Sequence, residues 1–178
     1  MTDPFALNAL ASLEPWRLWT GHLAHFGLRH ATLNLAALAI PWLLAGGRDR
    51  NRMILALLLV APVLSEGILW QLNGASYRGG SGLACVAWAM VGGLKASKRD
   101  SRLVGGLMLM LLAGKIAIER AAGVSLSLPT EDWQTMPAAH TMGAGLGLLS
   151  AAVLLAADAT RPIDPKEDSS SDLKAIHP

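Results

Sequence analysis

The chain has 178 residues, of which 52% are hydrophobic and only 16% are charged, and its formal net charge is +2. Soluble domains carry about 25% charged residues, so this composition is typical of a membrane protein with several spans. The single cysteine, Cys85, excludes an internal disulfide. The small net charge gives no reason to expect a nucleic-acid partner, and we expect neither a cofactor nor a metal ion. The lipid bilayer is the expected environment.

The first part of the chain contains an interfacial segment, two apolar runs and a basic loop between them. Residues 1–28 are mixed in character, and the cluster WRLW at residues 16–19 suits the headgroup region of a membrane. Residues 29–44 form the first predicted span. The sequence RDRNR at residues 48–52 follows as a loop, which the positive-inside rule places in the cytoplasm. Residues 53–72 then form a second span that returns outward.

Three further apolar runs follow. A loop rich in glycine and serine, residues 73–80, leads into a third span at residues 81–94. Residues 103–118 form the fourth predicted span and residues 136–157 the fifth. The remainder, residues 159–178, is rich in Pro, Asp, Ser and Lys and predicts a disordered cytoplasmic tail. We therefore predict an all-α membrane protein whose residues 29–158 form a bundle of five transmembrane helices, with the amino terminus outside.

The third span is short, and its length predicts the depth of Ser81. A helix from Ser81 to about Lys95 rises about 22 Å, less than the roughly 30 Å of a bilayer core. A basic cluster pins its far end to the cytoplasmic face; the cluster consists of Lys95, Lys98, Arg99 and Arg102. The end that carries Ser81 is therefore expected to lie below the outer surface. Such a serine is either a nucleophile or part of a small-residue packing face between helices.

Four polar residues fall at one depth in this map: His30, Asn34, Ser81 and His140. His140 is suited to act as general base for Ser81. His30 and Asn34 are four residues apart and share a helix face, so they and the Ser81 backbone N–H would stabilise an oxyanion. The alternative is that His30 and Asn34 only link helices by hydrogen bonds. No buried aspartate is available and Glu66 lies on another helix, so we predict a Ser-His dyad.

These residues resemble the three signature blocks of rhomboid intramembrane serine proteases. The blocks are HFGLRHATLN at residues 25–34, GGSG at 79–82, and HTMG at 140–143 with Gly147; WR at 16–17 and Ser65 extend the likeness over residues 16–157. The resemblance implies a rhomboid-like bundle. It also makes Ser81 the nucleophile, His140 the general base, and His30 and Asn34 the oxyanion donors, with His25 structural.

The resemblance has two departures and one refinement. The usual first rhomboid span does not precede residues 16–17 in this sequence, so the chain is either a five-span form or one whose start has been lost. Cys85 replaces a tyrosine that often stacks on the base. Around Ser81, the glycines Gly79, Gly80 and Gly82 leave room for the close approach of another backbone, such as a substrate strand. Residues 16–22 and the sequence KIAIE at 115–119 are most similar to rhombosortases. Lys115 and Glu119 could equally be an ordinary pair at the membrane interface.

The resemblance implies an intramembrane serine endopeptidase. The lack of an organelle targeting segment leads us to expect a bacterial inner membrane, with the site open to the periplasm. Its substrates would be single-span membrane proteins cut near the outer end of the span. For a rhombosortase they would be exported proteins with a carboxy-terminal Gly-Gly anchor. The competing function is a catalytically inactive rhomboid-like protein that binds or escorts transmembrane helices. The presence of both Ser81 and His140 favours the enzyme, because a binding protein needs neither.

Overall fold

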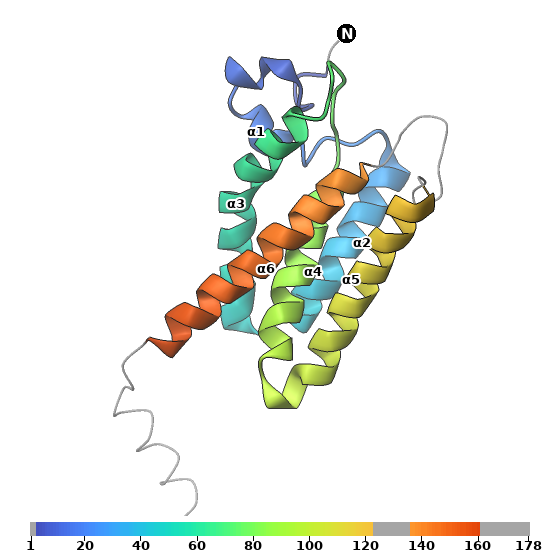
Figure 1. Cartoon of the computed structure of the whole chain (residues 1–178). Coiled ribbons are helices and arrows are strands. Elements are labelled where there is room, and N and C mark those ends of the chain that lie inside the picture. The colour runs from blue at the N-terminus through green and yellow to red at the C-terminus, as the bar shows by residue number, and fades with distance from the viewer. Residues whose placement is uncertain (1–2, 123–135, 161–178) are drawn as a thin grey trace, which may run out of the picture.

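The computed structural model of the protein describes residues 3–122 and 136–160. Within these ranges the regular elements are helices joined by turns and short loops (Figure 1). Two are short 3-10 helices, η1 (Ala9–Ser12) and η2 (Arg99–Ser101). The α-helices are α1 (Arg17–Thr20), α2 (Leu28–Leu44), α3 (Gly47–Leu69), α4 (Ser81–Ala96), α5 (Arg102–Ala122) and α6 (Pro137–Ala159).

Several of these helices have the length and composition of membrane spans. The helices α3 and α6, and the segment Arg99–Ala122 that contains α5, are long and apolar enough to cross a membrane. The helix α4 is also apolar but has only 16 residues. It rises about 24 Å, whereas a bilayer core is roughly 30 Å thick. These features support the predicted all-α membrane protein and confirm that the helix beginning at Ser81 is short.

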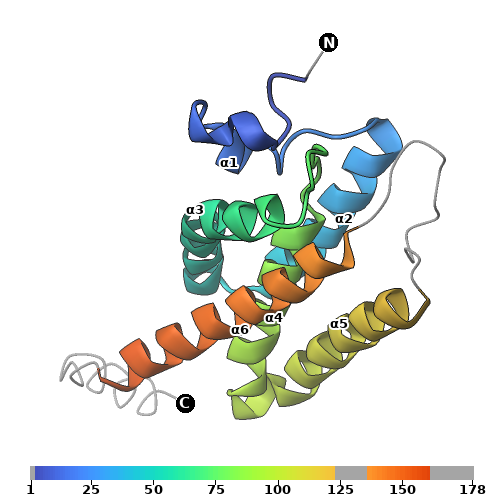
Figure 2. The same cartoon turned by 45° about the horizontal axis from the view of Figure 1, so that its top comes forward.

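The short helix α4 lies at the centre of the bundle. It contacts α2, α3, α5 and α6, and Figures 1 and 2 show it between them. Its side chains are buried around most of its circumference, including Ala87, Met90 and Val91. A helix that is apolar all round is stable only when neighbours cover it. The surrounding helices therefore fix the position of its first residue, Ser81.

Glycines bring α6 unusually close to α4. A Cβ on Gly143 would lie 2.3 Å from the carbonyl oxygen of Gly82, and a Cβ on Gly147 would lie 2.3 Å from that of Val86. Two glycines four residues apart on one face are a common device for close helix packing in membranes. They hold α6, which carries His140, directly against the helix that begins with Ser81.

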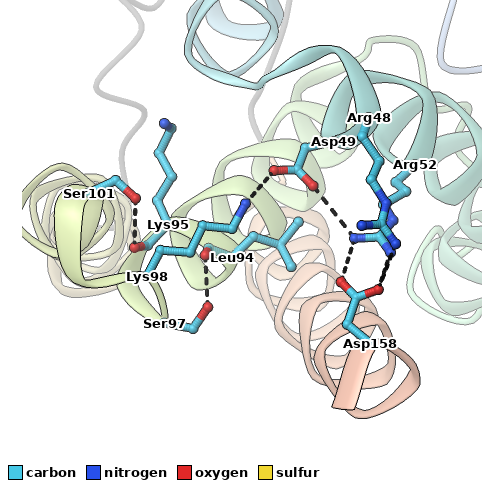
Figure 3. Close-up of polar contacts among 9 residues, drawn as sticks. All are labelled: Arg48, Asp49, Arg52, Leu94, Lys95, Ser97, Lys98, Ser101 and Asp158. Carbon is cyan, nitrogen blue, oxygen red and sulfur yellow. Dashed lines mark hydrogen bonds and ion pairs between the residues drawn. The ribbon is translucent and has the colours of Figure 1, made fainter. Parts of the chain in front are cut away.

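Ionic contacts join three elements at the end of the bundle away from Ser81. Asp158, near the end of α6, accepts hydrogen bonds from Arg48 at 2.9 Å and from Arg52 at 2.8 and 2.5 Å (Figure 3). Lys98, which follows α4, donates to Asp49 at 2.9 Å. The basic residues that predict a cytoplasmic face are thus gathered at one end of the molecule.

The ends of the helices differ from the predicted boundaries. Residues 48–52, predicted as a loop, form the first turns of α3, which also ends earlier, at Leu69. Asp49 in the first turn of α3 interacts favourably with the helix dipole, and Asp158 neutralises the neighbouring arginines. At the other end of the bundle, α5 continues past the predicted end at residue 118 and includes Glu119. The predicted tail lies outside the described residues from residue 161 onward.

The amino-terminal segment is folded onto the bundle. Leu7 forms an antiparallel bridge with Tyr77, in the loop that leads to Ser81. Trp16 and Trp19 are exposed, as expected for an interfacial segment. Arg17 is not at the surface as predicted, since it is only 3% exposed. Its guanidinium is paired with the carboxylate of Glu14 and donates to the carbonyl oxygens of residues 3 and 6, at 2.9 and 2.8 Å; these acceptors compensate the buried charge.

Candidate active site

All four predicted site residues line one cavity of about 310 Å³. His30 and Asn34 come from the start of α2, Ser81 from the start of α4, and His140 from the first turns of α6. Figure 1 shows that these helix ends lie together, on the side of the bundle that also holds α1. The remaining wall is mostly apolar and comprises Leu33, Ala37, Ile40, Tyr77, Arg78, Ala84, Cys85, Trp88, Leu111, Leu112, Lys115 and Met136.

The backbone before Ser81 is held in a conformation that requires glycine. Gly79 has a φ of 129°, which side chains rarely allow, and its N–H donates to the carbonyl oxygen of Gly21 at 2.9 Å. Gly80 is the N-cap of α4, so Ser81 is the first helical residue. The N–H groups of a first helical turn have no partner within the helix. This leaves backbone donors beside the Ser81 hydroxyl.

Two donors of α2 lie against this glycine segment. A Cβ on Gly79 would be 2.7 Å from Cε1 of His30 and 3.3 Å from Nδ2 of Asn34. Nδ2 of Asn34 is buried and has no hydrogen-bond partner in the described part of the chain. The N–H of Phe26 donates to Nδ1 of His30 at 3.5 Å, which places the imidazole proton on Nε2. The i, i+4 spacing therefore brings both predicted donors to one place.

His140 has an acidic partner that the sequence analysis missed. Its Nδ1 lies 2.7 Å from Oε2 of Glu119, and both side chains are almost fully buried. Lys115 donates to the other carboxylate oxygen of Glu119 at 2.7 Å, and its Nζ is 3.1 Å from Nδ1 of His140. The expectation that no acid supports the histidine is therefore wrong. Glu66, the acid considered for that place, is exposed on α3.

The serine and the histidine share the cavity but are not hydrogen-bonded to each other. Nε2 of His140 is buried and has no partner among residues 3–122 and 136–160. Ser81 is partly exposed. In proteins without bound substrate such hydrogen bonds are often long and shorten only when substrate binds. A bare imidazole nitrogen in the same cavity as a serine hydroxyl is an arrangement that allows general-base chemistry.

The glycines around Ser81 already have close protein neighbours. A Cβ on Gly80 would be 3.2 Å from the carbonyl oxygen of His22, and one on Gly82 would be 3.4 Å from that of Ala139. The backbones that approach Gly80 and Gly82 in this structure therefore belong to the protein. Because Gly80 and Gly82 have no side chains, the turn before α4 packs against residue 22 and the first turn of α4 packs against α6.

Tyr77 is a cavity residue to which the sequence analysis gave no role. It is buried, and burial raises its pKa to about 12, so the hydroxyl remains protonated at neutral pH. The hydroxyl lies close to the side chain of Ser81 and to the backbone of Gly82. From the sequence alone, a single tyrosine before a glycine-rich turn cannot be recognised as a residue that lines a cavity. Tyr77 adds a further polar group to the same cavity.

A second buried histidine, His22, stabilises the segment against which the glycines before Ser81 pack. Nε2 of His22 lies 2.9 Å from the hydroxyl of Ser65, which itself donates to the carbonyl oxygen of Leu18 at 2.7 Å. Burial lowers the pKa of His22, so the imidazole is neutral at pH 7. These bonds tie the segment around residues 18–22 to α3. Ser65, singled out only by resemblance, therefore helps to hold the carbonyl oxygens against which Gly79 and Gly80 pack.

No group of three or more His, Cys, Asp and Glu side chains in the described residues is arranged to hold a metal ion. Comparison with known proteins adds no relative: no protein-family model matches the chain, and no curated protein matches it.

Proposed function

We propose that the protein is an intramembrane serine endopeptidase of the rhomboid type. The observation that carries the proposal is the cavity that joins Ser81, Nε2 of His140 and Nδ2 of Asn34, two nitrogens that have no hydrogen-bond partner among the described residues. Ser81 begins a short helix in the centre of a bundle of apolar helices, and the other two groups face the same cavity from neighbouring helices. The five predicted spans and the rhomboid fold belong to the same proposal.

The hydroxyl oxygen of Ser81 attacks the carbonyl carbon of a peptide bond, and Nε2 of His140 takes the hydroxyl proton. When the tetrahedral intermediate collapses, the C–N bond breaks and His140 returns that proton to the leaving amine. Water then attacks the acyl-enzyme with His140 again as base. The ester bond to Ser81 then breaks, His140 returns the proton taken from water to the Ser81 oxygen, and the carboxyl product is released.

Glu119 completes a triad in this mechanism. A carboxylate that accepts the Nδ1 proton of the histidine fixes the tautomer whose Nε2 is free and stabilises the imidazolium that forms. The 2.7 Å contact between Glu119 and His140 supports this role. The proposal therefore replaces the predicted dyad by Ser81, His140 and Glu119.

The developing oxyanion would be bound by donors that converge beside Ser81. Nδ2 of Asn34 and the imidazole of His30 approach Gly79 from α2, and the Ser81 backbone N–H lies at the positive end of α4. Preorganised donors of this kind commonly make the largest single contribution to acyl transfer.

The cavity wall suggests how a membrane substrate enters. Leu33 and Ile40 of α2 and Leu111 of α5 line the cavity, yet all three are exposed. The main contacts of α2 and α5 are with α4 rather than with each other. A substrate would therefore enter from the lipid between α2 and α5. Its helix must unwind to offer a carbonyl group, which favours glycine near the cut.

The rhombosortase-like residues extend the proposal to a substrate class and a place. Residues 115–119 include two side chains that contact His140, namely those of Lys115 and Glu119. We infer that the substrates are exported proteins with a carboxy-terminal Gly-Gly motif before a single span. The membrane would be a bacterial inner membrane, with Ser81 on the periplasmic side.

A serine-reactive phosphonate tests the proposal directly. We expect the detergent-solubilised protein to be labelled at Ser81, and Ser81→Ala to abolish labelling. His140→Ala should reduce the labelling rate by roughly 100- to 10,000-fold, as expected for loss of a general base. Ser76→Ala, in the exposed loop before the site, is the control and should label normally. A folded wild-type protein that is never labelled would favour the non-catalytic helix-binding protein instead.

A further inference from the structure

The side chain of Lys115 lines the cavity and contacts two members of the proposed triad. We propose that Lys115 is a positioning residue that keeps Glu119 ionised, and through Glu119 keeps the proton of His140 on Nδ1. This inference rests on the proposed function, because it concerns how the base of that site is prepared.

Glu119 is buried, with a side chain that is 0% exposed. A carboxylate in apolar surroundings without a compensating charge takes up a proton and becomes neutral. Lys115 lies one turn earlier on α5, and its ammonium donates to Oε1 of Glu119 at 2.7 Å. Because the side chain of Lys115 is one-third exposed, its charge retains partial contact with water while that of Glu119 does not.

No other cation bonds to Glu119 within the described ranges. The neighbouring Arg120 donates to the hydroxyl of Thr141 at 3.1 Å, and Arg78 is paired with Asp3 at 3.5 Å. The remaining titratable side chains around the cavity are His140 on α6, Cys85 on α4, His30 on α2, and Tyr77 in the loop before α4. Lys115 is therefore the group that compensates the buried charge.

Nδ1 of His140 has two close polar contacts, one with Glu119 and one with Lys115. A ring nitrogen that carries a proton donates, and one that carries none accepts, so Nδ1 cannot serve Glu119 and Lys115 at once. The contact with Glu119 is the shorter, 2.7 Å against 3.1 Å, and a charge-assisted bond to a carboxylate is the stronger. Nδ1 therefore keeps its proton and donates to Glu119, which leaves Nε2 bare on the cavity side.

Without the charge of Lys115, the buried carboxylate of Glu119 would take up a proton. A protonated Glu119 can itself donate to Nδ1, and the imidazole proton would then move to Nε2. In that tautomer the nitrogen needed by Ser81 has no lone pair to accept a proton. The ammonium of Lys115 thus acts on the base without contacting the peptide bond. The ion pair is part of the catalytic arrangement rather than an interfacial pair of the ordinary kind.

Lys115→Gln tests this proposal, because glutamine keeps a hydrogen-bond donor and removes only the charge. We expect the rate of phosphonate labelling at Ser81 to fall at pH 7 by roughly 10- to 1000-fold, less than the about 10,000-fold known for replacing a triad carboxylate by an amide. The ratio of the variant rate to the wild-type rate should rise with pH, since Glu119 then ionises without help. Lys115→Arg should restore most of the rate.

A double variant shows whether Lys115 acts through Glu119. In a Glu119→Gln background, Lys115→Gln should cause no further loss, because its target is already neutral. If the labelling rate of the double variant falls by the product of the two single-variant factors, the proposal is overturned. It is also overturned if the labelling rate of Lys115→Gln falls by the same factor at every pH. Lys98→Gln is the matched control, because it removes an ammonium from a carboxylate at the far end of the bundle.

A spectroscopic measurement separates this proposal from the proposed function. In protein labelled with ¹⁵N-histidine, the ring nitrogen that carries the proton is distinguished from the bare one by its chemical shift. We expect the His140 proton on Nδ1 in the wild type and on Nε2 in Lys115→Gln at neutral pH. The same tautomer in both proteins would overturn the role of Lys115 even if Ser81 reacts. If the tautomer differs between the two proteins as expected but wild-type protein is never labelled at Ser81, the role of Lys115 stands and the serine protease is overturned.

Discussion

Nδ2 of Asn34 is a buried donor without a hydrogen-bond partner in the described part of the chain. Leaving such a donor unpaired costs about 1–3 kcal/mol, which is a reason to expect that substrate completes the bond. We predict that Asn34→Ala slows turnover of a cleavable substrate by about 100- to 1000-fold, the usual loss for one oxyanion donor, without lowering the thermal midpoint. Thr32→Ala, on the exposed side of α2, is the control. A normal rate in Asn34→Ala would return Asn34 to a purely structural role.

The meeting of the four predicted residues in one cavity could be expected from the sequence because several of its signals are local. The i, i+4 spacing of His30 and Asn34 and the position of Ser81 at the start of a short apolar run do not depend on distant contacts. Glu119 could not be placed in the same way. Its pairing with Lys115 satisfies it within one helix, while its contact with His140 joins residues 21 apart on two helices. Only the packing of α5 and α6 onto α4 brings that contact about.

At the scale of the helix, the approach of α6 to α4 depends on Gly147. We predict that Gly147→Ala destabilises the protein by about 1–3 kcal/mol, because the added methyl group would meet the carbonyl oxygen of Val86 at 2.3 Å. Gly145→Ala on the same helix is the matched control, since nothing lies within 4 Å of its Cβ position. Alanine at residue 145 should be neutral or stabilising by up to about 1 kcal/mol.

Unfolding midpoints in detergent measure both glycine variants. Equal midpoints for Gly147→Ala and Gly145→Ala would show that α6 can move away from α4 at no cost. The labelling rate at Ser81 adds a second readout, because His140 lies on the helix that would be displaced. We expect only Gly147→Ala to lower it.

The ends of helices were harder to predict than their existence. Residues 48–52 carry enough positive charge to predict a loop, yet they are helical because Asp158, from the end of α6, accepts hydrogen bonds from Arg48 and Arg52. The sequence around residue 50 contains no sign of that distant acceptor. The same holds for Arg17, whose burial depends on carbonyl groups 11 and 14 residues away. In both cases the arginine lies in a helix or in the interior, rather than in the predicted loop or at the surface, because acceptors from other parts of the chain bind it.

For the whole molecule, the separation of charges predicts its orientation in the membrane. In a Cys85→Ser background, Ser76→Cys should react with a membrane-impermeant maleimide on intact cells, because it lies in the exposed loop before Ser81. Ser97→Cys, beside the basic cluster, should react only after permeabilisation. Reaction of Ser97→Cys on intact cells would invert the topology and place the proposed site on the cytoplasmic side.

The proposed substrate class gives a contrast that depends on the whole bundle. A model protein with Gly-Gly just outside a single span should be cleaved when it is co-expressed with the wild-type protein. The same protein with Leu-Leu there should not be cleaved, because two good helix formers oppose the unwinding that exposes a carbonyl group. Cleavage is measured by release of the exported domain, with the Ser81→Ala variant as background. Equal cleavage of both would exclude selection by helix unwinding, and the triad would remain to be judged by phosphonate labelling.

The order of the helices along the chain has a consequence for the cell that makes the protein. The helix with the proposed nucleophile, α4, is synthesised before both α5 and α6, which supply Glu119 and His140. A nascent chain therefore holds Ser81 without its base, and the close contact of Gly147 with Val86 forms only once α6 has been inserted. Under the proposed function, newly made copies are therefore inactive while they leave the insertion machinery among other unfolded membrane proteins. Under the proposed function, proteolysis begins only when insertion is finished.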